Sequence, residues 1–291
     1  MTTQLLPGDE SLTELSPSEY LLRLGLAKGE RHDLATAALM LAALDRPEKK
    51  LAPFRAHLSE LAQAVRAEAD FARDAEGAAE ALASVIAGHY GYEGERSDYD
   101  DPRNADLMSV IERRRGLPVA LGILYIHAAR ACRMDACGLF APGHFLLRIG
   151  ARGSEAVIDP FNNGAVVDRE RMNMPRFGAR LHLAESGSTD RTDVFTPVGD
   201  GEVLLRLQNN IKNRALKTRD TPRAIEILRR MTLISPRRSV LWLELGRLQE
   251  STGALSAARN AYESCLRLLP SGDEISNEAA FALNALKRRL N

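Results

Sequence analysis

The chain has 291 residues, of which 45% are apolar, with 39 Lys+Arg against 39 Asp+Glu. This length suggests roughly two domains, and the balanced charge argues against a strongly electrostatic nucleic-acid binder. No apolar run approaches the length of a bilayer span, and the polar N-terminus lacks the pattern of a signal peptide. We therefore expect a cytoplasmic protein that binds neither nucleic acid nor a membrane.

The cysteines are a sparse and odd set: Cys132, Cys137 and Cys265. Such a set fits a reducing cytoplasm better than a disulfide framework. Because the spacing is not that of metal ligands, we expect no structural zinc, and we expect no other metal or cofactor.

The N-terminal part is predicted to be helical after a mobile tail at residues 1–15. The helical pattern runs from about residue 16 to residue 89. Its clearest stripe recurs at steps of three and four, which is typical of an amphipathic helix. The apolar positions of that stripe are Leu51, Phe54, Leu58, Leu61 and Val65.

A polar loop at residues 91–103 and a short helix at residues 105–113 precede a second helix at about 118–133. Pro118 suits the first position of that helix. Because the helix is apolar nearly all round, we expect it to be central and buried. The run Arg113-Arg114-Arg115 before it is interpreted as the solvated end of a helix; the alternative is a patch for an acidic partner.

Two β-patterned runs, at residues 144–149 and 155–159, flank a segment with the composition of a hairpin turn. If the turn centres near residues 151 and 152, His144 and Asp159 face each other at about 5 Å. Such a pair is the His–carboxylate half of a catalytic triad. Further short strands at residues 137–140 and 165–167 complete a small antiparallel sheet, so the sequence predicts an α+β layer arrangement with the central helix packed on the sheet.

Residues 184–200 contain Gly and Pro and few apolar residues, which indicates a linker. A 34-residue repeat follows, marked by the pairs Ala224/Ala258 and Pro236/Pro270. The second unit has residues at the offsets of a tetratricopeptide repeat, whereas the first is degenerate. Residues 277–290 are predicted to form a capping helix. Repeats of this kind bind peptides or proteins or merely pack on a neighbouring domain, and the sequence leaves both roles open.

Three segments carry a family resemblance: Gly116-Leu117-Pro118, Pro142-Gly143-His144-Phe145 and Ile158-Asp159-Pro160-Phe161. Together with the repeats behind them they resemble the transglutaminase-like superfamily, and most closely its SirB-type bacterial branch. The resemblance covers about residues 33–290. It implies a papain/transglutaminase-like core with a helical N-terminal part at residues 16–183, the linker at 184–200, and an all-α domain of two repeats plus capping helix at 201–291.

The resemblance also implies positions for a catalytic site. The histidine of the superfamily matches His144 and its aspartate matches Asp159, whereas its cysteine position matches Pro118, which has no nucleophile. Cys132 lies roughly 20 Å further along the helix. The remaining hydroxyls near the site belong to Ser109, Tyr125 and Ser154. Our candidate binding residues are Tyr99, Asn104, Arg115 and Phe145.

These observations predict a non-catalytic protein that binds a protein or peptide through the core groove, the repeats or both, with a regulatory role. His144 and Asp159 are then a retained hydrogen-bonded pair. The alternative is an amide-directed hydrolase or acyltransferase in which the pair activates water or a substrate nucleophile. A further version uses Cys137 as a relocated thiol, against its interpretation as a small buried hydrophobe. Oligomeric state stays open.

Overall fold

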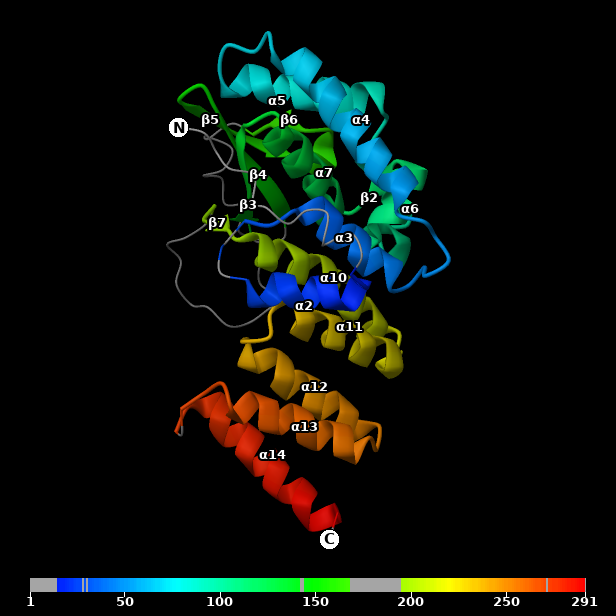
Figure 1. Cartoon of the computed structure of the whole chain (residues 1–291), viewed down its shortest axis with the longest axis vertical. Coiled ribbons are helices and arrows are strands. Elements are labelled where there is room, and N and C mark those ends of the chain that lie inside the picture. The colour runs from blue at the N-terminus through cyan, green and yellow to red at the C-terminus, as the bar shows by residue number, and fades with distance from the viewer. Residues whose placement is uncertain are drawn as a thin grey trace. The chain divides into compact units, whose positions relative to one another are not determined.

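Figure 1 shows a computed structural model of the chain. It describes residues 15–27, 29, 31–141, 144–167, 195–270 and 272–290. The predicted tail and most of the predicted linker therefore lie outside the described residues. Two units are distinguished by their internal packing: residues 29–207 form one, and residues 208–291 join residues 1–28 in the other. The predicted domain boundaries at 183 and 200 stay predictions.

The first unit begins with three helices, α3 (Leu34–Ala43), α4 (Ala52–Ala69) and α5 (Ala75–Ala83), and a π-helical turn, Ser84–His89. The stripe predicted at steps of three and four is the buried face of α4, apart from half-buried Leu51, which precedes the helix. This face packs on the central helix of the unit, α7 (Pro118–Ala131). Burial of a periodic apolar face is what stabilises a helix of this kind in water.

Helix α7 is the buried centre of this unit, as the sequence predicts. Pro118 is its first residue, and ten of its residues are buried. It follows α6 (Leu107–Arg113) and the short strand β2 (Arg115–Gly116), which pairs in parallel with β1 (Glu93–Gly94). Its apolar surface is nearly continuous because helices cover it on one side and a sheet covers it on the other.

In the described part of the chain, a five-stranded antiparallel sheet has the order β6-β5-β4-β3-β7. Its strands are β3 (Asp135–Ala141), β4 (His144–Ala151), β5 (Ser154–Asp159), β6 (Ala165–Val166) and β7 (Pro197–Val198). One face of β4 packs on α7: a Cβ placed on Gly122 would lie 2.4 Å from the Phe145 ring and 3.4 Å from Leu147. Only glycine lets the helix and the strand approach so closely. The fold class is therefore the predicted α+β core.

The hairpin between β4 and β5 turns at Arg152 and Gly153, one residue later than predicted. Both have positive φ, 50° and 81°, as in a two-residue turn of type I′. The strands then pair Ala151 with Ser154 and Leu147 with Ile158. The register is thus displaced by two residues from the one that would place His144 opposite Asp159.

A buried ion pair holds the start of α10 (Asp200–Lys217) against the core. The Asp200 side chain is 1% exposed and accepts two hydrogen bonds from Arg130, at 2.6 and 2.9 Å. The backbone N–H of His32 donates to the same carboxylate at 2.6 Å, and Arg130 also donates to the carbonyl of Ala136 at 2.9 Å. Three segments distant in sequence, around residues 32, 130 and 200, therefore meet at one carboxylate.

The second unit contains the repeats. Its helices include α11 (Thr221–Ile234), α12 (Ser239–Ser251), α13 (Leu255–Leu266) and α14 (Glu274–Leu290). Ala258 and Tyr262 are fully buried, and α14 contributes Leu283 and Leu286 to the same core cluster. The predicted capping helix is therefore present, although it starts three residues earlier than expected.

The N-terminal helix α2 (Pro17–Leu26) belongs to this second unit and packs on α11. At Gly25 the contact is so close that an added Cβ would lie 2.1 Å from the carbonyl oxygen of Leu233 and 2.6 Å from that of Ile234. The predicted domain that begins at residue 16 instead assigns this helix to the core. No local sequence pattern predicts that α2 and α11 pack together, because some two hundred residues separate the two helices.

Candidate functional site

The start of α7 is the position where the superfamily resemblance places a nucleophile. Pro118 is the first residue of the helix, and its neighbours Leu117 and Val119 are 0% and 1% exposed. The backbone N–H of Leu117 donates to the carbonyl of Asn104 at 2.9 Å. The residues at this helix start therefore carry apolar side chains, and none of them has a thiol or hydroxyl.

His144 is the first residue of β4 and is exposed. Side chains alternate between the two faces of a strand, so His144 shares a face with Leu146 rather than with Phe145 and Leu147, which contact α7. Its backbone carbonyl accepts a hydrogen bond from Arg206 at 2.7 Å. The alternation thus directs the imidazole to the face of the sheet that lies away from the start of α7.

Asp159 ends β5 and caps the 3-10 turn Pro160–Asn162 that follows. Its carboxylate accepts hydrogen bonds from the backbone N–H groups of Phe161, at 2.9 Å, and Asn162, at 3.3 Å. The side-chain amide of Asn162 donates to the other carboxylate oxygen at 2.5 Å. Among the described residues, the donors to this carboxylate come from its own turn and not from His144. The expected direct opposition of His144 and Asp159 is wrong, because the turn sits one residue later.

Cys137 lies opposite Arg148 in the β3–β4 pairing, four residues along β4 from His144. Four residues of strand span about 13 Å, which separates the thiol from the imidazole. Burial raises the pKa of the Cys137 thiol, although Arg148 opposes the shift. The geometry of a relocated thiol–imidazole pair is therefore not met. Cys132 lies beyond the far end of α7, where burial also raises the pKa of its thiol.

The three hydroxyls near the core have other surroundings. Ser109 accepts a hydrogen bond from Arg46 at 3.2 Å, and Ser154 accepts one from the backbone N–H of Ala75 at 2.8 Å. Tyr125 is 1% exposed, and its hydroxyl has no hydrogen-bond partner in the described part of the chain. Burial, with a smaller contribution from Asp159, raises the pKa of this phenol. A neutral phenol of raised pKa is a poor nucleophile.

Two of the four candidate binding residues lie in the interior. Asn104 is 0% exposed, donates to the carbonyl of Asp98 at 2.7 Å and accepts from Arg113 at 2.9 Å. Phe145 is 2% exposed and fills the space over Gly122. A partner at the surface cannot reach either side chain, so the structure assigns both residues to packing rather than to recognition.

The other two candidates are at the surface. Tyr99 is 46% exposed, and its ring meets the ring of Phe161 edge-on at 6.1 Å. The guanidinium of Arg96 lies 4.8 Å from the centre of the same Phe161 ring. Arg115 forms an ion pair of 2.5 Å with Glu93. Tyr99 and Arg115 therefore remain accessible. Tyr99 contacts Phe161, which lies two residues after Asp159, and Arg115 lies three residues before Pro118.

The run Arg113-Arg114-Arg115 is not an open basic patch. Arg113 lies 3.5 Å from Glu95 and 3.6 Å from Asp101, both of which are buried. The guanidinium of Arg114 donates hydrogen bonds to the imidazole of His57, at 2.6 Å, and to the Tyr92 hydroxyl. Each guanidinium has a partner within its own unit, and of the three side chains Arg115 is the exposed one, so the solvated interpretation describes Arg115 but not Arg113 and Arg114.

Arg114, His57 and Tyr92 form a cluster that the sequence did not predict. Burial and then the charge of Arg114 lower the pKa of His57, and burial raises the pKa of Tyr92 to about 12. Arg114 adopts a left-handed conformation, with φ of 59°. The three residues are 22 to 57 positions apart, so no local pattern could have indicated the contact.

Over the residues that the structure describes, no helix is both long and apolar enough to cross a bilayer. In the same residues, no group of three or more His, Cys, Asp or Glu side chains is arranged to hold a metal ion.

Comparison with known proteins gives matches over both units. The "UPF0162 protein" of Xylella fastidiosa strain Temecula1 is 32% identical over 183 residues, which cover 62% of this chain and 64% of that protein. The "UPF0162 protein" of Vibrio cholerae is 28% identical over 178 residues, or 61% of this chain and 66% of that one. The match thus spans slightly less than two thirds of these bacterial relatives.

More distant matches concern other kinds of protein. Mouse "F-box only protein 21" is 30% identical over 83 residues, which are 28% of this chain and 13% of that protein. A crystal structure of menin, described as revealing the binding site for the Mixed Lineage Leukemia protein, is 12% identical with a TM-score of 0.40. It covers 95% of this chain and 67% of menin, but a likeness this weak carries no argument about function.

Family profiles agree with the division seen in the fold. A tetratricopeptide-repeat profile matches residues 211–286. The profile of the transglutaminase-like superfamily matches residues 52–209, which is more than half of the chain and contains α7 and the whole described sheet. The chain therefore belongs to the transglutaminase-like superfamily, with tetratricopeptide repeats following its core.

Proposed function

We propose that this chain is a non-catalytic member of the superfamily that binds a protein or peptide partner and acts as a regulatory protein. The observation that supports this most directly is Pro118, which occupies the first position of α7 where the superfamily resemblance places the thiol. A thiol at a helix start is activated by the helix dipole and by neighbouring N–H groups, and proline removes both the nucleophile and an N–H donor.

The arrangement of His144 and Asp159 supports the same proposal. In a working triad the carboxylate holds the imidazole in its reactive orientation. Here the carboxylate is engaged by Phe161 and Asn162. Asp159 thus serves as a capping residue.

For the partner, the repeats are the stronger candidate. Arrays of such repeats bind protein segments on their surface. The repeat unit exposes a large apolar side chain on its last helix, since Phe281 of α14 is 74% exposed. Exposed aromatic residues are enriched among those that anchor partners. The free thiols of Cys132, Cys137 and Cys265 are consistent with a place in the cytoplasm.

Catalysis is tested by comparing the wild-type chain with the His144→Ala and Asp159→Asn variants on panels of amide and ester substrates, with and without an added amine acceptor. We expect no turnover that depends on either residue. Turnover by the wild-type chain that is lost in both variants would support the alternative of a hydrolase or acyltransferase with a non-standard nucleophile.

Partner binding is tested by affinity capture with quantitative mass spectrometry on the full chain. The variant is Phe281→Ser, and the matched control is Phe71→Ser, because Phe71 is 85% exposed and lies in the other unit. We expect a defined set of captured proteins that Phe281→Ser loses and Phe71→Ser keeps. Equal capture by all three chains would exclude this surface of the repeats as the binding element.

A further inference from the structure

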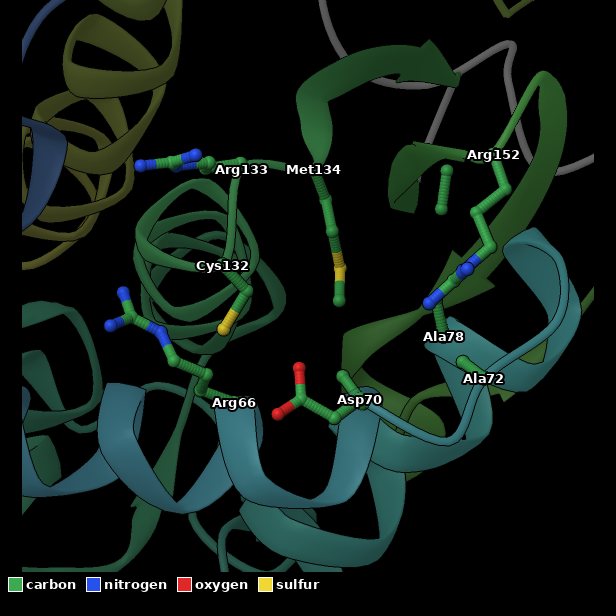
Figure 2. A pocket seen from close by; sticks show the side chains of 10 residues that line it. Arg66, Asp70, Ala72, Ala78, Cys132, Arg133, Met134 and Arg152 are labelled. Atoms are coloured by element: carbon green, nitrogen blue, oxygen red, sulfur yellow. The ribbon is translucent and has the colours of Figure 1, made fainter.

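A pocket of about 240 Å³ lies in the core unit, away from the start of α7. It is bounded by the end of α4, the start of α5, the end of α7 and the turn between β4 and β5 (Figure 2). Sites for drug-sized ligands usually measure about 300–1,000 Å³, so this pocket suits a smaller molecule.

Two opposite charges face this pocket from different elements. Figure 2 shows the carboxylate of Asp70, at the end of α4, pointing into the space beside Cys132 and Met134. The guanidinium of Arg152 reaches toward the same space from the β4–β5 turn. Within the described residues, neither side chain forms an ion pair or a hydrogen bond. Their charges are therefore available to a ligand.

The other arginines of the pocket differ from Arg152. Arg66 donates a hydrogen bond to the carbonyl of Ala131 at 2.5 Å, so its guanidinium is engaged. Figure 2 shows the guanidinium of Arg133 turned away from the space. Asp70 and Arg152 are thus the charged side chains that point toward the space and have no hydrogen bond in the described part of the chain.

The pocket is also lined by uncharged groups. They are small side chains, among them Ala72 and Ala78, and the thioether of Met134. The thiol of Cys132 adds no charge, since burial raises its pKa. A ligand that carries both an ammonium and a carboxylate would therefore meet an opposite charge on two sides of the space.

We propose that the pocket binds a free α-amino acid. Its carboxylate would pair with Arg152, whose planar guanidinium matches a carboxylate in two parallel hydrogen bonds, and its ammonium would pair with Asp70. The side chain would lie over the alanines and Met134. This assignment does not depend on the proposed partner of the repeats, because the pocket lies wholly within the core unit.

The backbone at Arg152 provides a sharp test. Arg152 has a φ of 50° at the first central position of a type I′ turn, where Asn, Asp and Gly are preferred. Left-handed arginines also occur at positions 114, 133 and 219, so the backbone alone does not mark the pocket. The substitution Arg152→Asn removes the guanidinium while suiting the turn better. A loss of binding in this variant cannot be attributed to a weaker fold.

The experiment is isothermal titration calorimetry of the full chain with each standard amino acid. We expect at least one to bind the wild-type chain, and Arg152→Asn and Asp70→Asn each to weaken that binding at least about tenfold. The control is Arg259→Gln, an exposed arginine on α13 in the other unit, which should bind like the wild type. Urea unfolding should show Arg152→Asn at least as stable as the wild type.

Derivatives of the best ligand identify the chemistry. Its N-acetyl form and its amide should each bind at least about tenfold more weakly, because each lacks one charge. The proposal is overturned if no amino acid binds in the millimolar range, or if Arg152→Asn binds as well as the wild type. Equal binding of acetate or inorganic phosphate would also overturn it, since the pocket would then be a simple anion site.

Discussion

Two carboxylates in the same unit, those of Asp200 and Asp159, differ in which groups donate hydrogen bonds to them. Asp200 is 1% exposed and accepts hydrogen bonds from Arg130 and from the backbone of His32. Asp159 lies at the end of a strand and accepts from its own turn, and His144, at the start of the neighbouring strand, is exposed. Within the described residues, the carboxylate that a family motif marks bonds its own turn, whereas the carboxylate without a motif bonds segments far apart in the chain. A motif locates a residue, but burial and donors decide what that residue does.

The largest effect is expected from Asp200→Ala. Removing one partner of a buried ion pair leaves the Arg130 guanidinium, 19% exposed, without its counter-ion, which typically costs about 3–5 kcal/mol. Urea unfolding of the full chain measures the loss. The double variant Asp200→Leu/Arg130→Leu should recover part of it, because no unpaired charge then remains. A loss below about 1 kcal/mol would mean that the pair is no tighter than a surface ion pair.

Asn104→Ala tests whether a candidate binding residue is structural. The substitution removes hydrogen bonds to two partly buried groups, the carbonyl of Asp98 and the Arg113 guanidinium, so we expect a loss of about 1–3 kcal/mol in urea unfolding. Tyr99→Ala is the matched comparison, because Tyr99 is exposed, and it should change the stability by less. Equal effects of the two substitutions would contradict the division between interior and surface candidates.

A double-mutant cycle on His144 and Asp159 tests their independence. Asp159→Ala removes a cap and should cost about 1 kcal/mol, whereas His144→Ala should stay within about 0.5 kcal/mol. Because the two side chains do not share a hydrogen bond, the effects should add to within about 0.5 kcal/mol. A larger coupling energy would mean that His144 and Asp159 interact, which would contradict the assignment of Asp159 to its own turn.

The smallest effect concerns pH and His57. Burial and Arg114 lower the pKa of His57 from its ordinary 6.5, so below that pH the unfolded chain takes up more protons than the folded chain. The neutral His57 therefore contributes its full share to the free energy of unfolding above pH 6.5. This share decreases as the pH falls through 6.5 toward the lower pKa of the folded state. Urea unfolding at several pH values should show a shallower decline for His57→Gln. Some decline should persist, since burial also lowers the pKa of His32.

Much of the fold could be predicted because its signals are local. The periodic stripe of α4, the apolar run of α7 and the 34-residue spacing of the repeats each report the environment of one or two helices. The hairpin was also predictable in kind. Its register was not, although Gly153 suits the second position of a type I′ turn and indicates a turn at 152–153. A shift of one residue at the turn displaced His144 by two positions relative to Asp159.

By itself, the sequence determined the α+β core, the repeats with their capping helix, and the proline at the start of α7. These depend on residue type and short-range spacing, which a chain carries wherever it folds. Tertiary structure alone decided that α2 joins α11, that Asn104 and Phe145 are interior, and that Asp70 and Arg152 share a pocket. Each of these facts depends on contacts between segments far apart in the chain, where the approach of two backbones, rather than local preference, sets which side chains meet.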